Sequence, residues 1–352
     1  MLFAGACSLQ FDDSFLESMS TESIIPKEMP SLADRMRGAI WGQFVGDAAC
    51  LGSHWIYDLA DLAQRYPVGL KGFEPPPAGH YHSGKAPGDQ THYGDAALLL
   101  LESVAEVGRF DAADFGRRFV ALTDSPAYTG YRDHATKNTL ANYRSFRDAH
   151  PGVQFDFQQG ANDDQPATAT RLAPVIVAHF RDEGLSQIVT AATRVCQNSE
   201  RAIAYMHCHA LVLSGLLDGR DLPAAFETAA EGCKAEGEFG AEVCRKVREA
   251  LAAKSLPVVE ATFGFGQSCP LASSFPSAVQ AALANSDDFV AAILATARAG
   301  GDNAARAALM GAWLGAWLGI RGVPAGWRER LTARAAISRA VEAIVARMAS
   351  SA

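Results

Sequence analysis

The chain has no pair of cysteines at the spacing of a metal knuckle or a redox motif. Its seven cysteines occur singly, at positions 7, 50, 196, 208, 233, 244 and 269. An odd number of scattered cysteines is typical of reduced thiols, because a disulfide framework needs paired and clustered residues. We therefore expect a cytoplasmic protein without a disulfide scaffold.

A basic tract is also missing, and so is an apolar run long enough to cross a membrane. The net charge is −8, whereas nucleic-acid binding needs an excess of Lys and Arg on one face. The strongest membrane candidate covers only residues 307–320, and a transmembrane helix needs about 20 apolar residues. These absences argue against nucleic acid and membrane as partners and favour a small molecule or another protein.

Alternating strand patterns are rare, and helical periodicity dominates from residue 32 onward. Alanine is abundant, apolar residues recur at intervals of three and four, and Gly, Pro or Asp stands at most joins. This pattern predicts an all-α fold, with one compact multi-helix domain over 31–350, because no linker separates regions of different composition. Residues 1–30 lack periodicity and are interpreted as a disordered or mis-called N-terminal extension. The segments 66–90 and 148–166 are predicted to be loops.

Two rows of glycines are spaced four residues apart on two predicted helices. Glycine costs a helix about 1 kcal/mol relative to alanine, so each row needs a structural reason. Close approach of two backbones would supply one, and we predict that the two rows lie in the same central helix pack. The rows are Gly38, Gly42, Gly46 and Gly311, Gly315, Gly319.

Two predicted helices start with polar residues that carry oxygen donors. Thr91 and Asp95 are four residues apart and share a helix face, and Asp302 precedes an Ala-rich helix at its N-cap position. Asp47 is a further carboxylate among apolar neighbours. Oxygen donors of this kind suit Mg²⁺ or Ca²⁺ rather than zinc.

Three histidines, His80, His82 and His92, lie close together in the sequence, so a zinc site has to be considered. Their spacing matches no zinc finger, and a loop gives them no fixed geometry. We therefore expect solvent-exposed loop histidines.

In order and spacing, these residues resemble the ADP-ribosylglycohydrolase family, an all-α fold whose hydrolytic members hold two Mg²⁺ ions. The resemblance runs from about residue 33 to residue 345. It implies hydrolysis of a glycosidic bond in an ADP-ribose- or nucleoside-type substrate. It rests on Gly-Ala-Ile-Trp-Gly at 38–42, Gly-Asp at 46–47, Thr91 leading into Leu-Leu-Leu-Leu-Glu-Ser at 98–103, Arg-Leu-Ala-Pro at 171–174, Gly-Gly-Asp at 300–302 and Gly-Ala-Trp-Leu-Gly-Ala at 311–316.

Two loops depart from the metal-binding pattern of the hydrolytic members. Where those members read Thr-Asp-Asp-Thr, residues 91–94 read Thr-His-Tyr-Gly, and where they read Asp-Thr-Asp-Thr, residues 302–305 read Asp-Asn-Ala-Ala. A catalytic glutamate that some members carry falls near His54. These departures resemble a divergent branch that includes the J1-crystallins and selenoprotein J. They imply a reduced or altered site that holds one Mg²⁺ rather than two.

The residues and the resemblance together suggest a role for each candidate residue. The metal ligands would be Thr91, Asp95 and Asp302. The catalytic residues would be Asp47, His54 and His92, with an imidazole as the general base because it titrates near neutrality. The substrate-binding residues would be Asn162, Asp163, Tyr131, Gly300, Gly301 and Asn303.

Three functions stay open at this point. The first is a hydrolase that acts on an ADP-ribose-like small molecule or an ADP-ribosylated protein. The second is a non-catalytic module that binds ADP-ribose-type ligands, and the third is a crystallin-like structural protein. Each candidate carboxylate also fits a role as a helix cap or a buried acceptor.

Overall fold

The computed structural model describes residues 29–350. Within this range the chain forms sixteen α-helices, one 3-10 turn at Leu51–Ser53 and no β-strand, which confirms the all-α prediction. The N-terminal extension predicted at 1–30 lies outside the described residues except for its last two. The helices are α1 (Leu32–Ala49), α2 (Leu59–Arg65), α3 (His92–Val107), α4 (Ala112–Thr123), α5 (His134–Ala149), α6 (Ala173–His179), α7 (Leu185–Arg194), α8 (Glu200–Leu217), α9 (Leu222–Cys233), α10 (Gly237–Ala252), α11 (Val258–Phe265), α12 (Leu271–Ala284), α13 (Phe289–Arg298), α14 (Asn303–Gly322), α15 (Ala325–Glu329) and α16 (Arg334–Ser350).

Polar caps explain where many of these helices begin. At five N-caps stands an aspartate whose side chain accepts a hydrogen bond from the backbone N–H three residues further on. Such a bond satisfies one of the N–H groups that a helix start leaves without an intrahelical partner. The five are Asp58, Asp111, Asp133, Asp221 and Asp288.

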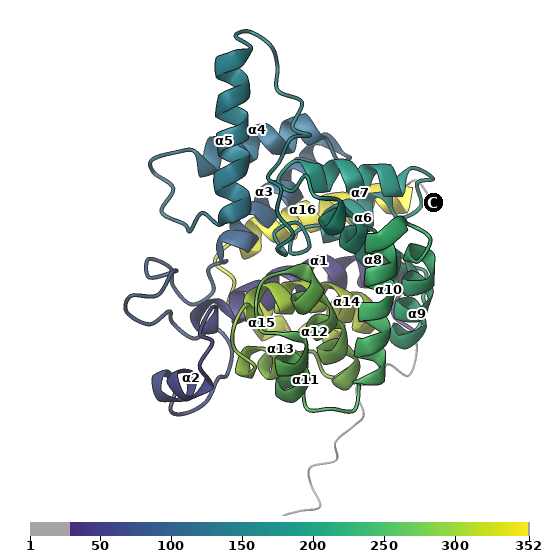
Figure 1. The fold of residues 1–352 in the computed structure, drawn as a ribbon. Helices are drawn as coiled ribbons and strands as arrows, with labels where there is room; N and C mark the ends of the chain where they lie inside the picture. The colour runs from purple at the N-terminus through teal and green to yellow at the C-terminus, as the bar shows by residue number, and fades with distance from the viewer. Residues whose placement is uncertain (1–28, 351–352) are drawn as a thin grey trace, which may run out of the picture.

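Helices α1 and α14 lie along each other at the centre of the fold (Figure 1). A Cβ atom added at Gly42 would meet the backbone carbonyl of Gly311, and one added at Gly38 would meet that of Gly315. Because backbone faces backbone, neither contact could be relieved by a side-chain movement. The prediction that the two glycine rows pack together is thus confirmed for these two pairs. Gly319 differs, since its φ of 70° breaks the helical geometry within α14.

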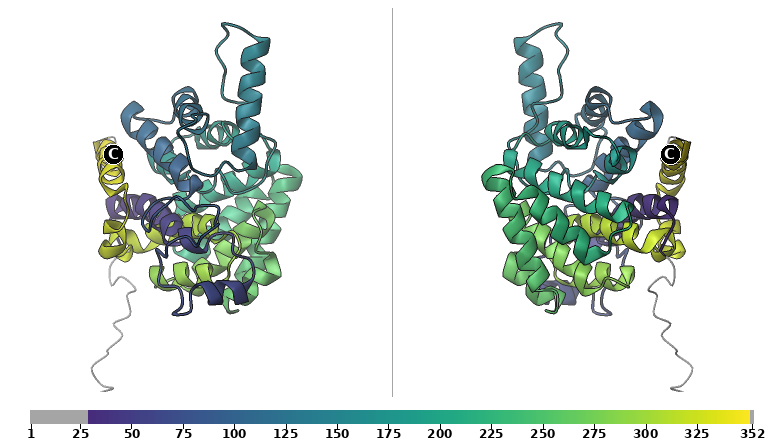
Figure 2. Two further views of the ribbon diagram at one scale, coloured as in Figure 1. Left: turned by 90° about the vertical axis from the view of Figure 1, so that its left-hand side faces the viewer. Right: turned by 90° about the vertical axis from the view of Figure 1, so that its right-hand side faces the viewer.

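The other helices surround this central pair. Helices α3, α6 and α16 contact α1, whereas α8, α12 and α13 contact α14. Helix α5 and the segment that follows it project from the body of the molecule (Figures 1 and 2). Over residues 29–350, no helix combines the length and the apolar character needed to cross a bilayer.

A short backbone pairing joins two loops that are far apart in the sequence. Ile56 and Gly301 form an isolated antiparallel bridge, in which the Gly301 N–H donates to Ile56 O at 2.8 Å. The Trp55 N–H donates to Gly301 O at 2.7 Å. Gly300 and Gly301 have φ values of 66° and 63°, a region that glycine adopts readily. The pairing brings His54 next to Asp302, at the start of α14.

Candidate active site

His54 and Asp302 form a fully buried pair. His54 Nε2 lies 2.8 Å from Asp302 Oδ1, and neither side chain is exposed to solvent. Asp302 occupies the N-cap position of α14, yet its side chain makes no capping hydrogen bond there. Its second oxygen, Oδ2, accepts from the hydroxyl of Tyr93 at 3.4 Å. The carboxylate is therefore used to hold a histidine rather than to cap the helix.

The pKa shifts of His54 and Asp302 indicate which of the two side chains carries the proton. Burial lowers the pKa of His54 to about 4, although the hydrogen bond with Asp302 acts in the opposite direction. Burial alone would raise the pKa of Asp302, but the hydrogen bond from His54 and the nearby positive charge of Arg306 hold it below its usual value. At neutral pH the pair is a neutral imidazole and a carboxylate. Because a carboxylate only accepts, Nε2 of His54 carries the proton and Nδ1 keeps a lone pair.

Two further imidazoles stack beside His54. The ring of His82 lies 5.1 Å from that of His54, and the ring of His92 lies 6.0 Å from it, with interplanar angles of 14° and 13°. Nε2 of His82 lies 2.9 Å from Nδ1 of His54. The three rings form a cluster that we call the histidine cluster. The expectation of exposed loop histidines is wrong for His82 and His92, which are 2% and 5% exposed, because the 66–91 loop folds inward and His92 is the first residue of α3.

Several nitrogens of the histidine cluster lack a protein partner. Nδ1 of His82 and both ring nitrogens of His92 make no hydrogen bond with any described residue. Nε2 of His92 lies 3.4 Å from Oδ2 of Asp133, an ion-pair distance without hydrogen-bond alignment. A buried polar atom left without a partner costs about 1–3 kcal/mol. Several such atoms in one place are unusual for a folded protein and require an explanation other than stability.

Asp47 and Thr91 fix the start of α3 beside the cluster. The carboxylate of Asp47 accepts from the Thr91 hydroxyl at 2.5 Å and from the Thr91 N–H at 2.7 Å. The Thr91 oxygen in turn accepts from the Tyr93 N–H, which caps α3. Burial raises the pKa of Asp47 to about 6, against the effect of these two hydrogen bonds. The Thr91 hydroxyl, predicted to bind a metal, thus donates to Asp47 and caps the start of α3 instead.

Asp95 has a cation of its own. Nζ of Lys85 lies 2.8 Å from each oxygen of this carboxylate, and the hydroxyl of Tyr128 donates to Oδ2 at 2.9 Å. Lys85 comes from the 66–91 loop, which therefore supplies both an ammonium group and His82 to the start of α3.

The three predicted metal ligands do not form a magnesium site in this arrangement. Mg²⁺ requires near-octahedral oxygen ligation. Thr91 is bound to Asp47, Asp95 to Lys85 and Asp302 to His54. The donor atoms that do cluster are imidazole nitrogens, which suit a different class of metal. The residues present therefore do not fit the pair of Mg²⁺ ions that the resemblance implies.

Aromatic rings cover the histidine cluster. The Trp55 ring stacks on His54 at 4.1 Å, and Tyr131 meets Trp55 edge-on at 4.9 Å. Tyr131, a predicted substrate residue, also lies 5.4 Å from the ring of His92. Trp55 has a φ of 61°, a left-handed conformation that is strained for a bulky residue and is found most often at functional sites.

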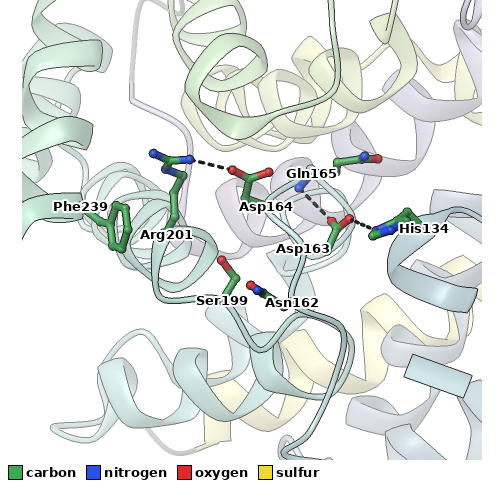
Figure 3. A pocket seen from close by; sticks show the side chains of 8 residues that line it. All are labelled: His134, Asn162, Asp163, Asp164, Gln165, Ser199, Arg201 and Phe239. Atoms are coloured by element: carbon green, nitrogen blue, oxygen red, sulfur yellow. Dashed lines mark hydrogen bonds and ion pairs between the residues drawn. The ribbon is translucent and has the colours of Figure 1, made fainter. Parts of the chain in front are cut away.

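A polar cleft opens beside the start of α5, where His134 lines it (Figure 3). Its volume is ≈ 530 Å³, within the usual range for small-molecule sites. Two of the predicted substrate residues, Asn162 and Asp163, line it, and Nδ1 of His134 lies 2.9 Å from Oδ2 of Asp163. His134 follows Asp133, the neighbour of His92, so the start of α5 connects the cleft with the histidine cluster. The remaining lining residues are Asp164, Gln165, Ser199, Arg201 and Phe239.

The other predicted substrate residues have internal roles. Gly300 and Gly301 form the turn that pairs with Ile56. The amide of Asn303 donates to the backbone oxygens of Ser53 and Ala297. The structure thus brings Asn162 and Asp163 together in the cleft and Tyr131 next to the cluster. Gly300, Gly301 and Asn303 instead form the buried turn and the first residue of α14.

Sequence reasoning missed three residues that the site depends on. They are Lys85, Asp133 as the neighbour of His92, and Trp55 as the cover of His54. Only the short spacing between His80 and His82 hinted that the 66–91 loop carries polar groups inward.

Comparisons with known proteins agree with this fold. Residues 28–352 match the ADP-ribosylglycohydrolase family model. Crystallin J1A and crystallin J1B of Tripedalia cystophora are each 25% identical to the chain, over 84% of it and 92% of their own length. A solved structure described as an ADP-ribosylglycohydrolase-related protein complex has a similar fold, with a TM-score of 0.67 and 22% identity over 90% of this chain and 99% of that one. The chain therefore belongs to the ADP-ribosylglycohydrolase family, as the sequence motifs predicted.

Proposed function

We propose that this family member binds the ribose end of an ADP-ribose-type ligand in the polar cleft, without the paired Mg²⁺ ions of the hydrolytic members. The ligand would be a free ADP-ribose-like molecule or an ADP-ribosylated protein. The observation that supports this proposal is that each predicted oxygen ligand already has a protein partner, including the Lys85 ammonium on Asp95.

The chemistry of the cleft suits a ribosyl group. Carboxylate and amide groups such as Asp163 and Asn162 can bond the hydroxyls of a ribose. Arg201 contributes a positive charge, although Asp164 and Glu242 already pair with it at 3.1 and 3.2 Å. The acidic balance favours the sugar, and any cationic group attached to it, over a bare phosphate.

Free thiols are consistent with a cytoplasmic location for such a protein. All six cysteines within the described part of the chain are unpaired, and five of them are buried. A reducing compartment keeps cysteines in this state.

Titration of ADP-ribose into the protein by calorimetry tests the binding proposal. His134→Ala removes an exposed ring at the cleft, and we expect about tenfold weaker binding, the equivalent of one good hydrogen bond. His150→Ala is the matched control, because His150 caps the far end of the same helix. The control should bind as the unchanged protein does. Absence of binding, or equal loss in the two variants, would contradict the proposal.

Hydrolysis of a glycosidic bond is the second candidate, and the His92–Asp133 contact favours it. A carboxylate beside Nε2 keeps the ring proton on that side, so the other nitrogen can take a proton from water. Incubation with arginine- and serine-linked ADP-ribose peptides, followed by detection of released ADP-ribose, separates the two candidates. If the protein binds these peptides but releases no ADP-ribose, the binding function remains and hydrolysis is excluded.

A further inference from the structure

We propose that the histidine cluster binds one transition-metal dication of the zinc class, a site separate from the oxygen ligands of the family and independent of the proposed function. One nitrogen from each of His54, His82 and His92 lies within 4.8 Å of those from the other two, and all three side chains are buried. The three residues come from three different parts of the chain: the 50–58 turn, the 66–91 loop and the start of α3.

A carboxylate lies beside two of the three rings. Asp302 accepts from Nε2 of His54, which leaves Nδ1 as the nitrogen that faces His82. Asp133 lies 3.4 Å from Nε2 of His92. Histidines that bind metals almost always direct their second nitrogen to a carboxylate, a carbonyl or a water. The arrangement around His54 matches that pattern.

The nitrogens without partners are a second, independent observation. A hydrogen bond between Nε2 of His82 and Nδ1 of His54 explains the 2.9 Å contact of those two rings. It does not explain Nδ1 of His92, which is buried without any partner among the described residues, whereas Nε2 of the same ring faces Asp133. A shared ion would use a lone pair from each ring.

The donor set selects the class of metal. Three imidazoles favour Zn²⁺, Co²⁺, Ni²⁺ or Cu²⁺, whereas Mg²⁺ requires oxygen. With Zn–N distances of about 2.0–2.1 Å, two ligands of a tetrahedral ion lie about 3.3 Å apart, so His54 Nδ1 and His82 Nε2 need to separate by a few tenths of an ångström. The proton of His82 moves from Nε2 to Nδ1 in the bound state. Three protein ligands leave a fourth position open for water.

Metal titration of untagged, chelator-treated protein tests the site. We expect one Zn²⁺ or Co²⁺ per chain by calorimetry, a tetrahedral absorption spectrum for bound Co²⁺, and a rise of the melting temperature with Zn²⁺. Mg²⁺ should produce none of these effects. Because an ion would occupy the nitrogen of His92 that the hydrolytic candidate uses as a base, turnover is measured separately on metal-free and metal-loaded protein.

Two cluster variants and one matched control make the test specific. His82→Asn and His92→Asn should each weaken Zn²⁺ binding at least tenfold, with folding checked by circular dichroism. His209→Asn removes a buried histidine that lies elsewhere, on α8, and should leave Zn²⁺ binding unchanged. Failure of the unchanged protein to bind Zn²⁺ or Co²⁺ would overturn the inference. The inference would also be overturned if both cluster variants bound Zn²⁺ as tightly as the unchanged protein. The three histidines would then form only a chain of hydrogen bonds.

Discussion

At the scale of single residues, Lys85 shows how the site departs from the family pattern. Its ammonium group contacts both oxygens of Asp95, the carboxylate that the sequence assigned to a metal. The positive charge there is carried by the chain itself and does not depend on an ion. The sequence could not predict this contact, because the path of the 66–91 loop is not encoded in any periodic pattern.

Asp302 illustrates what a single residue does and does not reveal in the sequence. Its position before an Ala-rich helix predicted a cap or a ligand, and it does lie at the N-cap position. Its actual partner, His54, is identified only once the Ile56–Gly301 pairing joins two distant loops. Contacts of this kind depend on the whole fold, whereas local spacing reports only on neighbours along one helix.

A buried histidine outside the site gives a prediction about pH. Burial lowers the pKa of His209 to about 3, and its Nδ1 accepts from Trp313 Nε1 at 2.9 Å. The unfolded chain takes up a proton below about pH 6.5 while the folded chain does not, so this residue reduces stability progressively as the pH falls from 6.5 towards 3.

His209→Asn should remove that acid penalty while keeping an acceptor for Trp313. When the pH falls from 7.5 to 5, the free energy of unfolding of the variant should decrease by about 2 kcal/mol less than that of the unchanged protein. Urea denaturation at the two pH values measures the difference. An identical pH dependence in both proteins would mean that His209 is not kept neutral by burial.

At the scale of elements, the glycine rows were the most predictive pattern in the sequence. Helical spacing fixed which glycines share a face, and the energetic cost of glycine in a helix required a close neighbour for that face. Both arguments are local, which explains why they succeeded for α1 and α14. The partner of Gly46 was not foreseeable in the same way, since it faces Ala307 rather than a glycine.

Gly42→Ala should therefore destabilise the protein by several kcal/mol, because the new methyl group would meet the backbone of Gly311. Gly264→Ala is the matched control within another helix, α11, where an added Cβ meets nothing within 4 Å. The control should gain up to about 1 kcal/mol from the better helix propensity of alanine. Thermal or chemical denaturation of both variants measures the contrast, and similar stabilities would rule out backbone contact between α1 and α14.

At the scale of the whole molecule, the helical core holds two loops and two helix starts around one region. The 50–58 turn, the 66–91 loop and the start of α3 supply the histidine cluster, and the start of α5 supplies one wall of the cleft. All-α architecture and family membership could be predicted from the sequence, because they rest on periodicity and ordered motifs. The sequence could not predict that Asp95 pairs with Lys85 and Asp302 with His54 instead of binding a metal, because these contacts depend on how the loops meet.

Calorimetric titration of ADP-ribose into EDTA-treated protein, with and without added Mg²⁺, is the most direct measurement. With Lys85 on Asp95 and His54 on Asp302, binding should occur in both conditions with the same Kd within about twofold, a difference below about 0.5 kcal/mol. Binding that requires Mg²⁺ would contradict the assignment of protein groups to the positions of the family's metal ions.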